Sequence, residues 1–195
     1  MRPSRFYAAC RALVRFYFAV FLPLLAKGVE NIPPDGAVIL CGNHISMLDP
    51  LAIAVIARRP IHFMAKKELF AFKPLGALLR SLNAFPVNRK NTDMSAMRTS
   101  ISILKDGRVL GIFPEGARRK DEAHPELETG VGLIALRSKA ALVPVRIIGP
   151  YRLFRKTGVV FGPPVDFREF WAHVDGNALA EAMERIEKAI FSLSI

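Results

Sequence analysis

The chain has 195 residues, of which 51% are hydrophobic, enough to fill one core in a single domain. Lysine and arginine outnumber aspartate and glutamate by 28 to 17, and the resulting net charge of +11 predicts an anionic partner: nucleic acid, a membrane surface or a phosphorylated substrate. The two cysteines and four histidines show no zinc, redox or other metal-ligand spacing, so we expect neither a metal site nor a cofactor.

The first 30 residues combine positive charge with an apolar run. No acidic residue precedes Glu30, and the uncharged run at residues 16–26 is eleven residues long and contains a proline. A helix that spans a bilayer needs about 20 apolar residues, so this run is too short for a simple span. With Arg11 and Arg15 one helical turn apart, the segment favours a helix that lies in the membrane interface.

Two alternatives for this segment remain. One is a helix buried against the rest of the chain. The other is a signal peptide, although Leu24 and Ala26 make a poor cleavage site. We expect residues 1–30 to anchor the chain to a membrane and residues 31–195 to form the folded domain, with a Pro/Gly turn region at the boundary.

Apolar strand patterns alternate with helical patterns along the rest of the chain. Strands are predicted at residues 37–42, 61–65, 83–89, 109–113, 141–148 and 158–162. Helices are predicted at residues 49–59, 69–82, 92–107, 130–140 and 177–193, the second of them interrupted by Pro74. This alternation predicts an α/β fold, a single domain with a mixed sheet flanked by helices, preceded by an amphipathic membrane-associated helix.

The stretch "CGNHISMLDP" at residues 41–50 places His44 and Asp49 between the first predicted strand and the first predicted helix of the domain. Five residues along a helix leave two side chains roughly 140° apart, and five along a strand place them on opposite faces. The pair can therefore meet only if the chain bends. A carboxylate that accepts one imidazole N–H leaves the other nitrogen free to act as a general base. The alternative is a capping box from Ser46 to Asp49 without chemistry.

Two further strand ends carry charged residues. "GIFPEGARRK" at residues 111–120 leads from a buried strand into Glu115, Gly116 and a run of three cations that includes Arg118. "FPVNR" ends the strand at 83–89 with Arg89. Arginines at such positions can form charge-assisted hydrogen bonds to a phosphate. A solvated basic loop also explains the cations, but not the Phe-Pro-Glu-Gly that precedes them.

Taken together, the motifs N-H-x-x-x-x-D, F-P-V-x-R, F-P-E-G-x-R and V-P-V occur here in an order and spacing that resembles the glycerolipid acyltransferases, the 1-acylglycerol-3-phosphate acyltransferase family. The resemblance covers about residues 30–165. It implies that His44 and Asp49 are the catalytic pair. It also implies that Arg89, Glu115, Gly116 and Arg118 bind the acceptor, and that Pro144 belongs to an element linked to the acyl donor.

Two positions depart from the family pattern. The second motif usually opens with glycine, where this chain has Asn83, and the third usually has threonine where this chain has Ala117. Both departures concern the motifs that bind the acceptor. They leave the catalytic pair intact.

The resemblance implies a membrane-associated enzyme at the cytoplasmic face of the cell membrane. It would transfer a fatty acyl group from a thioester, on coenzyme A or an acyl carrier protein, to lysophosphatidic acid, giving phosphatidic acid. The same chemistry on another lysophospholipid or lipid acceptor is one alternative, and a basic membrane-binding protein without catalysis is another. Nucleic acid is not expected as a partner, because the chain carries no recognisable nucleic-acid-binding module.

Overall fold

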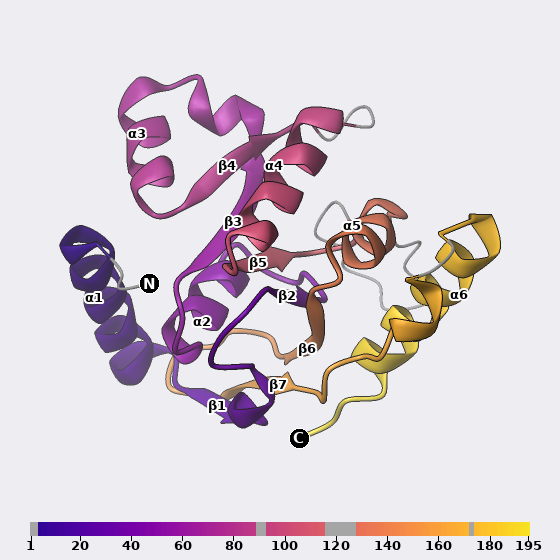
Figure 1. The fold of residues 1–195 in the computed structure, drawn as a ribbon. Helices are drawn as coiled ribbons and strands as arrows, with labels where there is room; N and C mark the ends of the chain where they lie inside the picture. Colours follow the sequence, from indigo (N-terminus) through magenta and orange to yellow (C-terminus); the bar gives the residue numbers. More distant parts are fainter. Residues whose placement is uncertain (1–3, 89–92, 116–127, 172–173) are drawn as a thin grey trace.

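The computed structural model describes residues 4–88, 93–115, 128–171 and 174–195. Its centre is a seven-stranded sheet with the strand order β1-β7-β6-β2-β5-β3-β4. The strands are β1 (Leu24–Lys27), β2 (Val38–Gly42), β3 (Ile61–Lys66), β4 (Ala84–Val87), β5 (Val109–Ile112), β6 (Ala141–Ile148) and β7 (Thr157–Phe161). Neighbouring strands are parallel except for β6 and β7, so the sheet is mixed, as predicted (Figure 1).

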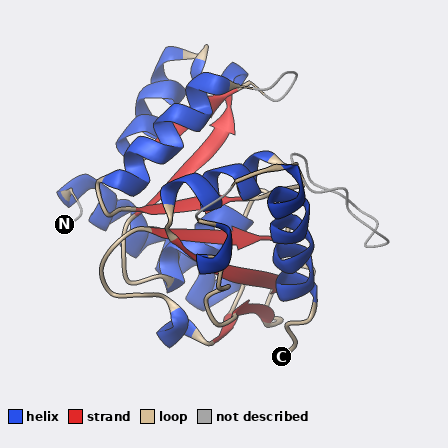
Figure 2. Cartoon of the chain, turned by 45° about the vertical axis from the view of Figure 1, so that its right-hand side comes forward, coloured by secondary structure: helices blue, strands red, loops and turns tan. Residues whose placement is uncertain are grey.

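Helices cover both faces of this sheet (Figure 2). They are α1 (Arg5–Phe21), α2 (Asp49–Ile56), α3 (Lys73–Ser81), α4 (Met94–Lys105), α5 (Gly130–Ser138) and α6 (Gly176–Phe191). Helices α1 and α2 pack on one face, whereas α4, α5 and α6 pack on the other. Helix α3 follows a short 3₁₀ helix at Lys67–Phe70 and lies at the β4 end of the sheet.

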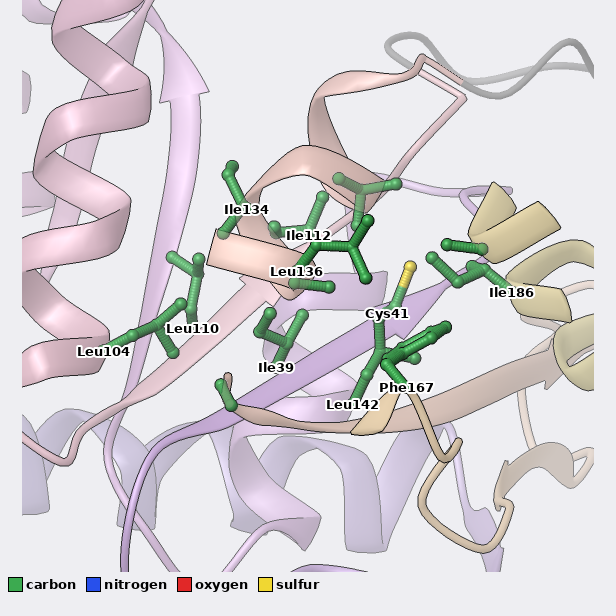
Figure 3. Close-up of a cluster of buried hydrophobic side chains, with 14 of the residues drawn as sticks. Ile39, Cys41, Leu104, Leu110, Ile112, Ile134, Leu136, Leu142, Phe167 and Ile186 are labelled. Atoms are coloured by element: carbon green, nitrogen blue, oxygen red, sulfur yellow. The ribbon is translucent and has the colours of Figure 1, made fainter. Parts of the chain in front are cut away.

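The alternation of side chains along β2 divides the core between these two faces. Ile39 and Cys41 belong to the cluster formed with α4, α5 and α6, which Figure 3 shows around Leu110, Leu136 and Leu142. Val38 and Leu40 belong to the cluster formed with α1 and α2. All of β2 is buried, as expected for a central strand of a sheet covered on both sides.

The order of predicted elements agrees with the structure from β2 to α6, with ends that shift by a few residues. Pro74 does not interrupt a helix: it lies in the first turn of α3, where its missing N–H breaks no helical hydrogen bond. Strand β1 was not predicted. It pairs in parallel with β7, so residues 24–27 of the predicted anchoring segment also belong to the sheet. The division of the chain near residue 30 stays a prediction.

Helix α1 has two different sides. Its inner side packs against the domain through the buried residues Tyr7 and Phe18. Arg11 also faces inward, where its guanidinium donates to the carbonyls of Val55 and Ala57 at the end of α2. Arg11 therefore holds α2 instead of facing outward like Arg15, which is exposed. Among the described residues, no helix combines the length and the hydropathy needed to cross a bilayer.

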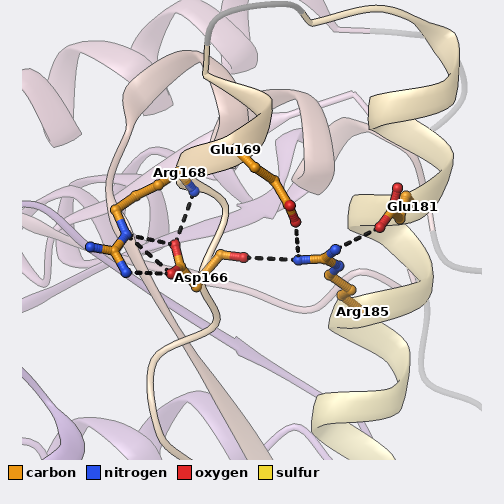
Figure 4. Close-up of polar contacts among 5 residues, drawn as sticks. All are labelled: Asp166, Arg168, Glu169, Glu181 and Arg185. Carbon is orange, nitrogen blue, oxygen red and sulfur yellow. Dashed lines mark hydrogen bonds and ion pairs between the residues drawn. The ribbon is translucent and has the colours of Figure 1, made fainter.

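Exposed ion pairs connect the segment after β7 to α6 (Figure 4). The Asp166 carboxylate accepts hydrogen bonds from the Arg168 guanidinium, and Arg185 of α6 pairs with Glu169 and Glu181. These bonds to Arg168 lower the pKa of Asp166 to about 2. The network is open to solvent, and such pairs contribute little to stability.

Candidate active site

Three of the predicted site residues, His44, Asp49 and Glu115, lie together at one edge of the sheet. Strands β2, β3, β4, β5 and β6 run parallel, so their carboxyl ends meet at this edge. In sheets of this kind, ligands bind outside the carboxyl ends of the strands. His44 follows β2 there, and Glu115 follows β5.

The structure brings His44 and Asp49 together. The chain leaves β2 at Gly42, turns, and begins α2 at Asp49, which returns the carboxylate to the imidazole. The distance between His44 Nδ1 and Asp49 Oδ2 is 2.8 Å. His44 is 8% exposed and Asp49 is 0% exposed, so the bond is shielded from water. With the carboxylate ionised, Nδ1 carries the proton, and Nε2 is left as an acceptor.

The Asp49 carboxylate is fixed by the backbone of the same turn. Its Oδ2 also accepts hydrogen bonds from the backbone N–H groups of Ile45 and Ser46, both at 2.7 Å. The bond to Ser46 is half of the capping box that the sequence allows, and the Ser46 hydroxyl accepts from the Leu48 N–H. The capping turn and the imidazole partner therefore occur together, since one oxygen atom serves both.

Asn43 fixes the end of β2 beside His44. Its side-chain amide donates to the Ile147 carbonyl at 3.0 Å and accepts from the Ile147 N–H at 2.7 Å. The amide thus replaces the backbone ladder where β2 leaves β6, and it satisfies two buried polar groups. Because His44 directly follows Asn43, these bonds also fix the position of the His44 backbone.

An aromatic stack holds the imidazole ring from one side. The Phe113 ring stacks on His44 with 4.3 Å between ring centroids and 21° between planes, and Phe63 of β3 stacks on Phe113 at 6.0 Å. Gly111 permits this arrangement: a Cβ built there would lie 2.1 Å from the Phe63 ring. The ring of His44 is therefore held both by its hydrogen bond and by this stack.

Glu115 also turns toward the pair. Its Oε1 accepts a hydrogen bond from the His44 backbone N–H at 3.3 Å, and the side chain is buried. Burial, and in second place the charge of Glu115, raises the pKa of the Cys41 thiol. Glu115 thus joins the loop after β5 to the turn that carries His44. Its predicted role in binding the acceptor stays a prediction.

The remaining predicted site residues differ in what the structure says of them. Arg89, Gly116 and Arg118 lie outside the described residues. Pro144 is buried inside β6, opposite Cys41 of β2, and so lies within the sheet rather than at the carboxyl edge. Its link to the acyl donor stays a prediction.

Asn83, which stands where the family pattern has glycine, adopts a left-handed backbone with φ of +64° after α3. Glycine is favoured in this conformation, and asparagine is one of the few other residues that tolerate it. The departure is therefore conservative for the backbone that leads into β4.

A cavity of about 670 Å³ opens on the side of α4 and α5; neither His44 nor Asp49 lines it. Phe113, whose ring stacks on His44, lines it together with Pro114, Asn88 and the helix residues Met97 and Leu133. A volume of this size is typical of small-molecule sites. In the part of the chain that the structure describes, no group of three or more histidine, cysteine or acidic residues is arranged to hold a metal ion.

Three residues around the pair were missed in the sequence: Asn43, Phe113 and Tyr151. The first two are part of the motifs, but nothing in the sequence signals that they contact β6 or the His44 ring. Tyr151 follows β6, where burial and, next, the charge of Asp49 raise the pKa of its phenol. The Tyr151 hydroxyl interacts with the Asp49 carboxylate, and neither this hydroxyl nor Asp49 Oδ1, both buried, has a hydrogen bond of ordinary length among the described residues.

Comparison with known proteins decides the family. A model of the acyltransferase family matches residues 24–148 of the chain. The chain belongs to the acyltransferase family. The residues of the pair and Glu115 lie within the matched region, and the resemblance found in the sequence motifs is confirmed.

Individual relatives agree with this assignment. The chain is 37% identical over 160 residues to a 1-acyl-sn-glycerol-3-phosphate acyltransferase of Bacillus subtilis, covering 79% of each protein. It is 33% identical over 148 residues to the enzyme of the same name from Streptococcus pneumoniae, covering 72% of this chain and 54% of that one. The crystal structure of the 1-acyl-sn-glycerophosphate (LPA) acyltransferase PlsC from Thermotoga maritima has a TM-score of 0.75 and 25% identity, covering 95% of this chain and 78% of that chain. The α/β fold of the acyltransferase is thus confirmed.

Proposed function

We propose that this acyltransferase moves a fatty acyl group from an acyl thioester to the free hydroxyl of lysophosphatidic acid, giving phosphatidic acid in phospholipid biosynthesis. One observation carries the proposal: a buried His44–Asp49 pair at the carboxyl edge of the sheet, in a chain whose named relatives are 1-acylglycerol-3-phosphate acyltransferases.

His44 acts as the general base. Its Nε2 accepts the proton of the acceptor hydroxyl as that oxygen attacks the thioester carbonyl carbon. The carbon–sulfur bond then breaks, and the thiol leaves with the proton returned by the imidazolium. Asp49 keeps the Nδ1–H tautomer in place and stabilises the imidazolium, as a buried carboxylate does for a catalytic histidine. The step needs no covalent acyl-enzyme and no cofactor.

Binding of the two substrates is assigned from the motifs. Arg89 and Arg118 bind the phosphate of the acceptor, Glu115 and Gly116 belong to the same acceptor-binding motif, and Pro144 belongs to the element for the donor. The cavity lined by Phe113 has the size to receive an acyl chain. The donor thiol is either coenzyme A or an acyl carrier protein.

Helix α1 associates the enzyme with the cytoplasmic face of the cell membrane. Its outer side exposes Leu13 and Phe16 to 70% and 64%, and Arg15 of the same helix is exposed as well. An amphipathic helix with cations of this kind binds the interface of an anionic bilayer. Both the acceptor and the product are lipids, so a place at this interface gives direct access to them.

The test is acyl transfer from a labelled thioester, followed by lipid extraction. The wild-type protein is incubated with acyl-coenzyme A or acyl carrier protein and with lysophosphatidic acid or other lysophospholipids. Labelled phosphatidic acid as the main product supports the proposal and identifies the donor. Product with another acceptor alone would contradict the assigned substrate, and no product with any donor would contradict catalysis.

A further inference from the structure

The loop between β6 and β7 carries the sequence "RLFRK" at residues 152–156, and all five residues are exposed. Leu153 is 63% exposed and Phe154 72% exposed, between three cations and without an acidic neighbour in the loop. Two large apolar side chains at that exposure do not stabilise the domain. Such a patch with a cationic rim indicates a surface for binding.

The backbone of the loop supports the same reading. Phe154 has a φ of +59°, in the left-handed region. An aromatic residue in this conformation is strained, whereas glycine or asparagine adopts it with less strain. The chain thus keeps an exposed phenylalanine at a position that disfavours it, and strain of this kind concentrates at functional sites.

The loop joins the outer side of α1. The Phe154 N–H donates to the Phe21 carbonyl at 2.8 Å, and the two rings lie 6.4 Å apart between centroids. The large apolar side chains exposed along α1 are Phe6, Leu13, Phe16, Tyr17, Val20 and Phe21. The loop therefore extends the apolar side of α1 into one surface, here called the α1–loop surface, made of these six residues with residues 152–156.

We propose that the α1–loop surface docks on an anionic bilayer, with Leu153 and Phe154 inserted among the lipids and Arg152, Arg155 and Lys156 against their phosphates. The inference rests on the proposed function, in which α1 alone meets the membrane. Charge favours this occupant: the described part of α1 and residues 149–157 contain cations and no acidic residue. Apolar side chains flanked by lysine and arginine match the acyl region and the phosphates of such a bilayer.

The position of the loop also relates the membrane to the active site. Tyr151, directly before it, packs against Phe18 of α1 with 6.2 Å between ring centroids and lies beside Asp49. The loop follows the carboxyl end of β6 and therefore lies at the same edge of the sheet as His44, with Tyr151 between it and Asp49.

The experiment is sedimentation with vesicles of phosphatidylcholine, with and without phosphatidylglycerol. Phe154→Asn removes the ring and suits the left-handed backbone, so its melting temperature should equal or exceed that of the wild type. Its affinity for the vesicles should fall roughly tenfold, the effect of withdrawing one large apolar side chain from lipid. Val174→Asn, at an exposed residue before α6 on the other face of the sheet, is the matched control and should bind like the wild type.

A second variant tests the charges. Replacing Arg152, Arg155 and Lys156 together by glutamine should weaken binding only where phosphatidylglycerol is present, and added salt should reduce the difference.

Unchanged vesicle binding by folded Phe154→Asn would overturn the role of the loop while leaving α1 as the anchor. A wild-type protein that binds no vesicles would instead contradict the membrane part of the proposed function, and acyl transfer to dispersed substrate would still test catalysis. If the loop variants bind vesicles like the wild type but lose self-association in light scattering, the α1–loop surface binds a second copy of the chain, and the proposal that it binds lipid is overturned.

Discussion

Two carboxylates in this enzyme hold partners at nearly the same distance, in opposite environments. Asp49 lies 2.8 Å from His44 and is fully buried, whereas Asp166 lies 2.6 Å from Arg168 with 56% of its side chain exposed. The exposed pair brings together two opposite charges that water already solvates. The buried carboxylate costs free energy unless it is satisfied by hydrogen bonds, and three donors converge on its Oδ2. The environment, not the distance, distinguishes an active-site pair from a surface pair.

The largest expected effect is on His44. His44→Ala should slow acyl transfer about 10²–10⁴-fold, because one positioned general base contributes that much. The rate is measured with saturating donor and lysophosphatidic acid, and circular dichroism checks the fold. His62→Ala is a matched control: His62 lies in β3 with its ring near the Val109 carbonyl, away from Asp49, and its loss should leave the rate close to wild type.

The next effect separates the cations proposed to bind substrate from cations that only form surface pairs. Arg89→Ala or Arg118→Ala should weaken use of the phosphorylated acceptor roughly tenfold or more, since a hydrogen bond to a charged group contributes about 1.5–3 kcal/mol. The parameter to measure is the apparent KM for the acceptor, with the KM for the donor as reference. Arg168→Ala, in the exposed network, should change neither. Equal losses toward both substrates would point to a folding defect.

A smaller effect is expected at Tyr151. Its phenol interacts with the buried Asp49 carboxylate, whose Oδ1 has no hydrogen bond of ordinary length among the described residues, so we expect the hydroxyl to donate to that oxygen during the reaction. Tyr151→Phe keeps the ring on Phe18 and should lower kcat about two- to tenfold with little change in KM, the effect of one hydrogen bond. Tyr7→Phe is the control, because the buried Tyr7 hydroxyl contacts the Ile61 N–H instead. An unchanged kcat in Tyr151→Phe would contradict a role for the Tyr151 hydroxyl in acyl transfer.

The smallest effect belongs to Asp166. Its pKa of about 2 in the folded state lies below the usual value, so its pairing favours folding above about pH 4 and is lost as the pH falls toward 2. Because the group is exposed, Asp166→Asn should leave the melting temperature at pH 7 nearly unchanged. The small difference from wild type should vanish at low pH. A large loss of stability at pH 7 would contradict the claim that these exposed ion pairs contribute little to stability.

Local sequence patterns could predict some of these elements and site residues but not others. The strands from β2 onward are apolar runs between turns, and the residues of the pair stand at a strand end and a helix start, so both were predicted. Strand β1 could not be, because its Leu24–Lys27 run continues the apolar pattern of α1 and pairs only through the distant β7. Arg11 was read as an interfacial cation, but its partners are carbonyls of α2, far along the chain.

The support around the pair was equally hidden. The bonds of Asn43 to Ile147 and the stack of Phe113 on His44 join residues in or directly after different strands, and no local pattern encodes which strands become neighbours. Phe154 is the reverse case, since "RLFRK" is visible in the sequence but its exposure and left-handed backbone are not. The motifs thus identify the residues, and the fold determines what they contact.

The most direct test of the central claim is a double-mutant cycle on the pair, in rates of acyl transfer. If His44 and Asp49 act as one unit, His44→Ala with Asp49→Asn should be no slower than His44→Ala alone, because the carboxylate acts only through the imidazole. Asp49→Asn alone should be slow, and its melting temperature should be recorded because Ile45 and Ser46 also bind that carboxylate. Losses that simply multiply in the double variant, or a folded His44→Ala protein with a near wild-type rate, would contradict the mechanism.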